Sequence, residues 1–179
     1  MSKLLRLAMI CTAALALAGC WQANYALFYV SDSAQPDIDG TWEVTSASYH
    51  PTTTQMPKKF RLSRAAKGGF MLSSLDPKVS GKDQQLVLIP LRLEDVYIVG
   101  VRTSTGSRGE RWVYNLLRLE GSKALLVEGK CSKDAVAGIS GTGAGCTARH
   151  GTPMLAAAYD QLSKPGAWTS ATQLQRIAR

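Results

Sequence analysis

Hydrophobic and polar residues alternate with a period of two along most of the chain between residues 41 and 131, which is the pattern of half-buried β-strands. Trp42 and Val44 mark one face of the first such segment. Short turn-forming stretches separate the segments, so the pattern predicts a mainly β fold, a small antiparallel β-barrel or sandwich of about seven strands. The predicted strands cover residues 41–49, 58–64, 70–75, 84–93, 96–103, 110–119 and 123–131.

After residue 150 the pattern changes to the 3.6-residue period of an α-helix. Thr152 is a suitable N-cap and Pro153 a suitable first helical residue, and Lys164-Pro165-Gly166 would end the helix. A second short helix is predicted from Ser170, so the fold carries one or two C-terminal helices. The residues on the apolar face of the first helix are Met154, Leu155, Ala158, Tyr159 and Leu162.

The N-terminal segment has the three parts of a bacterial secretory signal. Lys3 and Arg6 precede an apolar run, and small residues follow it. The apolar stretch is shorter than the about 20 residues that a membrane-spanning helix needs. The four residues that close the segment are Leu17, Ala18, Gly19 and Cys20, and they resemble the lipobox of bacterial lipoproteins.

This resemblance implies that residues 1–19 are a cleaved signal peptide and that Cys20 carries a diacylglycerol on its thiol and an acyl chain on its amine. Several acyl chains together make a stable membrane anchor, and no other cofactor is expected. Trp21 follows Cys20. By the enterobacterial sorting rule this implies that the protein is anchored in the inner leaflet of the outer membrane and faces the periplasm. Anchoring in the inner membrane is the alternative. Cleavage would leave 160 residues, with 19 basic and 13 acidic side chains.

Residues 20–39 are predicted to form a tether between the lipid and a single globular domain of residues 40–179. The apolar run Tyr25–Val30 is unusual for a solvated linker. It would either dock on the domain as an edge strand or lie near the membrane, where Trp21 and Tyr25 suit the headgroup layer.

Cys131 and Cys146 remain once Cys11 leaves with the signal and Cys20 is lipidated. Because the periplasm is oxidising, the two are expected to form a disulfide. It would close a glycine-rich loop and contribute about 3 kcal/mol in the chain-entropy model. A metal site is not expected, since the chain has no CxxC motif and only two histidines.

The whole chain has a formal net charge of +8. Such a charge favours anionic partners, either an anionic lipid or lipopolysaccharide surface or an acidic envelope protein. A solvated strand face is the alternative interpretation, and the envelope compartment argues against nucleic acid. The basic residues that gather along one predicted hairpin are Lys58, Lys59, Arg61, Arg64 and Lys67.

Motifs for catalysis are scarce, so the chain is predicted not to be an enzyme. Gly138-Ile139-Ser140-Gly141 is one residue short of a GxSxG nucleophile elbow and lies in the disulfide loop. His50 and His150 are predicted in loops, and only a nearby carboxylate such as Asp37, Asp39 or Glu94 would make either a general base.

Gly40 and Trp42 open the first predicted strand and are similar to the GxW signature of lipocalins. In that family the tryptophan closes the floor of the barrel and packs under a late basic residue, for which Arg118 and Arg149 are the candidates here. A β-barrel or sandwich of another lipoprotein family, with Trp42 as an ordinary core aromatic, is the alternative.

Three functions follow from these features. The first is a non-catalytic envelope lipoprotein that binds a partner protein or an envelope component. The second is a lipocalin-like carrier of a small apolar ligand, and the third is a hydrolase of envelope polymers. A carrier needs an apolar internal site, whereas an adaptor needs an exposed patch.

Overall fold

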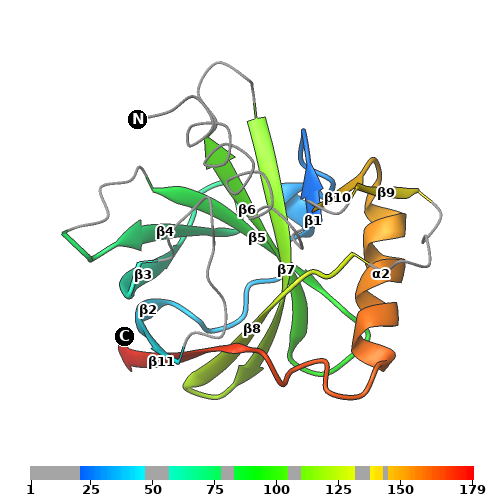
Figure 1. The fold of residues 1–179 in the computed structure, drawn as a ribbon. Helices are drawn as coiled ribbons and strands as arrows, with labels where there is room; N and C mark the ends of the chain where they lie inside the picture. Colours follow the sequence, from blue (N-terminus) through cyan, green and yellow to red (C-terminus); the bar gives the residue numbers. More distant parts are fainter. Residues whose placement is uncertain (1–20, 47–56, 78–82, 105–109, 132–137, 143–144) are drawn as a thin grey trace, which may run out of the picture.

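Eight antiparallel strands close into a barrel in the computed structural model of the chain (Figure 1). The structure describes residues 21–46, 57–77, 83–104, 110–131, 138–142 and 145–179. The barrel strands are β2 (Gly40–Ser46), β3 (Lys59–Arg64), β4 (Phe70–Ser74), β5 (Gln84–Pro90), β6 (Val96–Ser104), β7 (Glu110–Glu120), β8 (Lys123–Glu128) and β11 (Thr172–Ala178). The mainly β prediction is confirmed, with a barrel rather than a sandwich.

Strands β2 to β8 pair with their neighbours in sequence, and β11 closes the barrel. Leu174 of β11 lies opposite Ala124 of β8 on one side and Val44 of β2 on the other. The second helix predicted from Ser170 is therefore wrong, because residues 172–175 pair with β8 and residues 173–178 pair with β2 as a strand. All seven predicted strands are present, with small differences at their ends.

One α-helix, α2 (Gly151–Ser163), packs on the outside of the barrel (Figure 1). His150, not Thr152, occupies its N-cap position, and Lys164 follows its end as predicted. Tyr159 is more exposed than predicted and accepts a hydrogen bond from the backbone N–H of Arg92 through its hydroxyl, at 2.8 Å. The buried face instead consists of Met154, Ala157, Ala158 and Gln161.

Three short strands extend the sheet beyond the barrel: β1 (Trp21–Ala23), β9 (Ile139–Thr142) and β10 (Gly145–Ala148). β1 pairs antiparallel with the first half of β7 and parallel with β10. The second half of β7 pairs instead with β8. β1 thus pairs with the part of β7 that does not pair with β8.

The prediction of a tether over residues 20–39 is wrong for its described part. Trp21 is 1% exposed, and the backbone N–H of Ala34 donates to the carbonyl of Leu88 at 2.7 Å. A 3₁₀ turn, η1 (Val30–Asp32), lies between these two contacts. Strand β1, which is paired on both sides, precedes the apolar run, and Tyr29 within that run is 79% exposed.

Two apolar cores lie on the two faces of the barrel wall. The inner core lies inside the barrel and takes residues from all eight of its strands. The outer core lies between the outside of β5 to β8, the helix α2 and strands β1 and β10. The continuous apolar run of β5 follows from this arrangement: Leu86 and Leu88 face the inner core, whereas Val87 and Ile89 face the outer one.

Candidate functional site

Trp42 is buried inside the end of the barrel at which β2 begins, which we call the floor. Its indole N–H donates to the carbonyl of Ile38 at 2.9 Å, and its ring is 2% exposed. The guanidinium of Arg176 lies 5.7 Å from the centre of the ring, within cation–π range. Arg176 also donates to the carbonyl of Asp37 at 2.8 Å, which holds it across the floor.

The late basic residue on Trp42 is thus neither Arg118 nor Arg149, and both of those predictions are wrong. Arg118 instead lies 5.0 Å from the ring of Trp168 on the outside of the barrel. Arg149 is exposed at the end of β10, where its carbonyl accepts a hydrogen bond from the hydroxyl of Tyr25. Arg176 was missed because the residues from Ser170 onward were predicted to form a helix. A residue in that helix was not expected to pair with the strand that carries Trp42.

The opposite end of the barrel, which we call the mouth, has a ring of polar side chains on its inner face. Successive side chains of a strand point to opposite faces, so residues two apart share a face. Asn115 therefore faces the inside with Leu117, and Thr172 faces it with Leu174. The polar residues assigned to the ring by such spacing and by cross-strand pairing are Ser74, Gln84, Asn115, Glu128 and Thr172.

Two atoms of this ring are buried without a hydrogen-bond partner in the described part of the chain. They are Oδ1 of Asn115 and Oγ1 of Thr172, in side chains 7% and 2% exposed. A buried polar atom left unpaired costs about 1–3 kcal/mol, so native proteins rarely retain one without a functional or solvent partner. The pair therefore marks the mouth as a place where a ligand can add hydrogen bonds.

The largest fully buried side chains of the inner core lie toward the floor. The lower interior is filled by Trp42, Phe60, Phe70 and Leu88, all of which are almost completely buried. The inward-facing side chains higher in the barrel keep part of their surface exposed, and they include Val44, Val101 and Leu126. Apolar walls below a polar ring suit a small molecule with an apolar body and a polar end.

Beyond the ring, the inner face of β7 continues onto the strands of the extension. Val113 and Gln22 lie opposite each other on β7 and β1, and Gln22 pairs next with Thr147 of β10. The guanidinium of Arg111 donates to the side-chain oxygen of Gln22. We call the face formed by Arg111, Val113, Gln22, Thr147 and Ser140 the shelf. Arg111 is the one charged residue among these five.

Tyr97 is the described group whose pKa departs from its ordinary value. It lies on the inner face near the floor, opposite Leu117 of β7. Partial burial, and to a smaller extent the nearby carboxylate of Asp95, raise the pKa of its hydroxyl above 10.0. The phenol therefore stays neutral at physiological pH and offers no general base.

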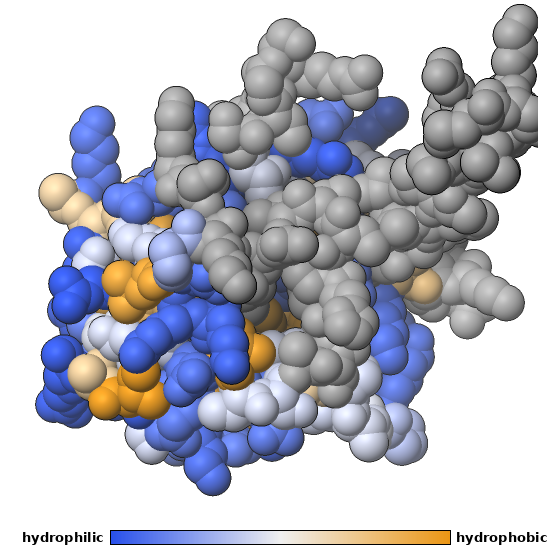
Figure 2. All heavy atoms as spheres, turned by 60° about the vertical axis from the view of Figure 1, so that its left-hand side comes forward, coloured by the Kyte–Doolittle hydropathy of each residue, from blue (hydrophilic) through white to orange (hydrophobic). Residues whose placement is uncertain are grey.

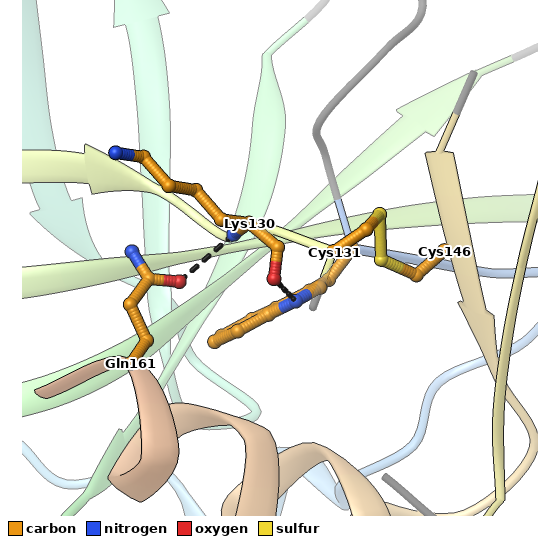
Figure 3. Close-up of a disulfide and its surroundings, with 5 residues drawn as sticks. Lys130, Cys131, Cys146 and Gln161 are labelled. Atoms are coloured by element: carbon orange, nitrogen blue, oxygen red, sulfur yellow. Dashed lines mark hydrogen bonds between the residues drawn. A yellow bond between two sulfur atoms is a disulfide. The ribbon is translucent and has the colours of Figure 1, made fainter. Parts of the chain in front are cut away.

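The predicted disulfide joins Cys131 and Cys146, whose Cα atoms are 5.6 Å apart (Figure 3). It links the segment after β8 to strand β10. Beside it, the side chain of Gln161 from α2 accepts from the N–H of Lys130 at 2.8 Å, and the indole N–H of Trp21 donates to the carbonyl of Lys130 at 3.0 Å. Helix, disulfide and β1 are thus fixed to one short piece of backbone.

The basic residues of the predicted hairpin lie on and beside β3. Lys59 and Arg61 alternate with the buried Phe60 and Leu62 and so point outward. Arg64 forms an ion pair with Asp39 at 2.8 Å, while Lys58 and Lys67 are exposed. Figure 2, which brings the side of β3 and β4 forward, shows a largely hydrophilic face with small separate apolar areas.

The remaining predicted site residues divide into two groups. Leu17, Ala18, Gly19 and Cys20 lie outside the described residues, as does His50. His150 is exposed at the start of α2, while the carboxylates of Asp37 and Asp39 are engaged by Arg179 and Arg64 at the floor. The structure thus places two of the proposed carboxylate partners in ion pairs of their own.

No protein-family model, curated protein or solved structure matches this chain. Among the described residues, no helix is long and apolar enough to cross a membrane, and no group of three or more metal-ligating side chains occurs.

Proposed function

We propose that the chain is a lipid-anchored envelope protein whose barrel binds a small amphipathic ligand at its mouth. The observation that supports this most directly is that two buried atoms on the inner face of the barrel, Asn115 Oδ1 and Thr172 Oγ1, have no hydrogen-bond partner among the described residues. Apolar side chains with exposed surface lie below them, so the ligand would place its apolar part there and its polar end in the ring. The lipid on Cys20 would hold the carrier at the envelope.

Native mass spectrometry of the full chain, extracted from membranes in a mild detergent, tests this proposal. Wild-type protein should carry a bound small molecule, and the double variant Asn115→Leu/Thr172→Val should have lost it. Thr45→Val is the matched control, because the Thr45 hydroxyl lies on an exposed side chain and bonds to the carbonyl of Gln173. Equal ligand content in all three proteins, or none in any of them, would overturn the carrier function.

Lipidation is tested separately through the thiol that it requires. Labelling with radioactive palmitate should mark the wild-type protein and not Cys20→Ser, and only the wild type should fractionate with membranes. Equal labelling of both proteins would overturn the anchor and leave the carrier function to be judged by mass spectrometry alone.

Binding of an acidic partner is the second candidate, and the exposed basic side chains of β3 support it. Lys59 and Arg61 both point away from the barrel, at neighbouring outward positions of one strand. Charge reversal at both positions should reduce recovery of a crosslinked envelope protein while leaving ligand content unchanged. Unchanged recovery would remove this candidate.

A further inference from the structure

The shelf carries a row of uncharged polar side chains that crosses three neighbouring strands. Trp21 of β1 and Cys146 of β10 pack in the outer core. Because successive side chains of a strand point to opposite faces, the next residues, Gln22 and Thr147, lie on the shelf. These two are cross-strand partners, and Ser140 of β9 is the next partner in the same row. An amide and two hydroxyl groups thus follow one another across β1, β10 and β9, which lie side by side beyond the barrel (Figure 1).

Arg111 lies at the barrel end of this row. Its guanidinium donates to the side-chain oxygen of Gln22, so the amide nitrogen of Gln22 keeps both of its N–H groups as donors. That amide nitrogen and the other nitrogens of Arg111 have no partner among the described residues, and none of them is buried. The two side chains therefore hold each other in place while they keep several N–H groups in contact with solvent.

The positive charge of the shelf is separated from the carboxylate of the polar ring. Glu128 lies opposite Asn115, which is four residues along β7 from Arg111. At strand spacing this separation is roughly 13 Å, longer than the about 8 Å over which exposed charges act at physiological ionic strength. Arg111 therefore keeps its attraction for an anion, and the neighbouring amide and hydroxyl groups can all donate hydrogen bonds to that anion.

A phosphate is the anion that these donors fit best. The planar guanidinium of arginine matches the oxygens of a carboxylate or a phosphate through two parallel N–H groups. A phosphate has more oxygens than a carboxylate, so it can also accept from the amide of Gln22. Neighbouring strands lie about 4.8 Å apart, which places Thr147 and Ser140 roughly 5 and 10 Å beyond Gln22. The hydroxyl groups of a sugar that carries the phosphate would lie within this range.

We propose that the shelf binds a phosphorylated sugar. The phosphate accepts from the guanidinium of Arg111 and the amide of Gln22. The sugar extends across the strands and bonds through its hydroxyl groups to Thr147 and Ser140. This site lies outside the polar ring, and it does not depend on the ligand proposed for the mouth. Free sugar phosphates and phosphorylated glycans of the envelope share this chemistry.

Titrations of the full chain in an uncharged polyoxyethylene detergent, followed by its amide NMR signals, test this site. The probes are inorganic phosphate, acetate, glucose 6-phosphate and glucose. Glucose 6-phosphate should bind most tightly, phosphate less tightly and acetate less tightly still, while glucose should not bind measurably. The signals of residues 22, 111 and 147 should shift. The absence of saturable shifts with glucose 6-phosphate, or equal affinity for acetate and phosphate, would overturn the proposal.

Arg111→Gln should weaken the binding of phosphate and of glucose 6-phosphate by about tenfold or more, because it removes a hydrogen bond between charged groups. Arg102→Gln is the matched control. Arg102 is exposed on β6 and pairs with Trp112, which faces the outer core, so this variant loses the same charge from the other face of the sheet. Its affinity should change by less than about twofold. Equal losses in the two variants would show that net charge attracts the anion, and would overturn the site.

Thr147→Val separates the sugar from the phosphate. It should weaken glucose 6-phosphate by about fivefold and leave inorganic phosphate unchanged, because the exposed hydroxyl bonds to the sugar alone. Unchanged affinity for glucose 6-phosphate would overturn the sugar ligand. Asn115→Leu/Thr172→Val should leave both affinities unchanged, so a failure of the proposed function at the mouth is distinguishable from a failure of this site. Lipopolysaccharide that displaces glucose 6-phosphate would assign the site to envelope glycans, and a lack of displacement would assign it to free sugar phosphates.

Discussion

Replacing Thr172 by valine should stabilise the ligand-free protein, although it removes a polar group from a well-ordered strand. The hydroxyl of Thr172 is buried, with 2% of the residue exposed, and its oxygen has no hydrogen-bond partner in the described part of the chain. Valine has nearly the same shape and an equal preference for strands. The substitution therefore leaves the packing in place and removes only an unpaired polar atom.

The expected magnitude follows from the burial of that atom. An unpaired buried hydroxyl costs about 1–3 kcal/mol, and a buried methyl group in its place contributes roughly 0.8 kcal/mol. Allowing for partial relaxation, we expect a gain of about 1 kcal/mol in the free energy of unfolding. For a protein of this size that corresponds to a rise in Tm of about 3 °C.

The assay is urea unfolding of ligand-free protein, followed by circular dichroism. Thr103→Val is the matched control, because the Thr103 hydroxyl donates to the carbonyl of Arg111 at 3.1 Å. That variant should lose about 1 kcal/mol, since a made hydrogen bond disappears. When ligand is added, wild-type protein should be stabilised more than Thr172→Val. The reason is that the folded wild type binds the ligand more tightly than the folded variant does.

A loss of stability in Thr172→Val, equal to that in Thr103→Val, would refute this reasoning. It would show that the Thr172 hydroxyl has a partner in the folded protein and is not free to meet a ligand.

Three further predictions concern the scaffold. Gly129→Ala should destabilise the fold by about 1–3 kcal/mol in urea unfolding, because its Cβ would meet the Trp21 ring; unchanged stability would mean that β1 can move away. Replacing Cys131 and Cys146 by serine should lower the free energy of unfolding by about 3 kcal/mol, and a smaller loss on urea unfolding would show that the loop is already ordered by its other contacts. Stability should fall as pH rises above 10, because the raised pKa of Tyr97 makes the folded state hold the phenol proton more tightly than the unfolded state. The fall should be smaller in Tyr97→Phe. Equal falls in the two proteins would show that other groups cause the loss of stability.

The barrel could be predicted from the sequence largely because its strands alternate clearly. Along β7, Trp112 and Tyr114 face one core while Leu117 faces the other, so period two is visible even where both faces are buried. Strand β11 was missed because residues 172–178 contain four polar side chains and an apolar spacing that also fits a helix. Its conformation depends on ladder partners in β2 and β8, and local sequence does not show those partners.

The polar ring could not be predicted for a related reason. Asn115 and Thr172 are ordinary polar residues in their own segments, and only the pairing of strands distant in sequence places them on one inner face. The disulfide and the Trp42 floor were predicted because each depends on a local motif or on the cysteine count. Arg176 completes that floor from the far end of the chain, beyond the reach of any local pattern.

The position of β11 in the sequence has a consequence for the proposed export. The strand that closes the barrel, β11, is the last element of the chain, and it pairs Leu174 with Val44 across most of the sequence. Contacts so distant in sequence form slowly and only after the intervening chain is available. A chain that passes through a translocation channel from its N-terminus cannot complete this barrel until its final residues have emerged. If the chain is exported as proposed, the late position of β11 would delay closure of the barrel until residues 172–178 have crossed.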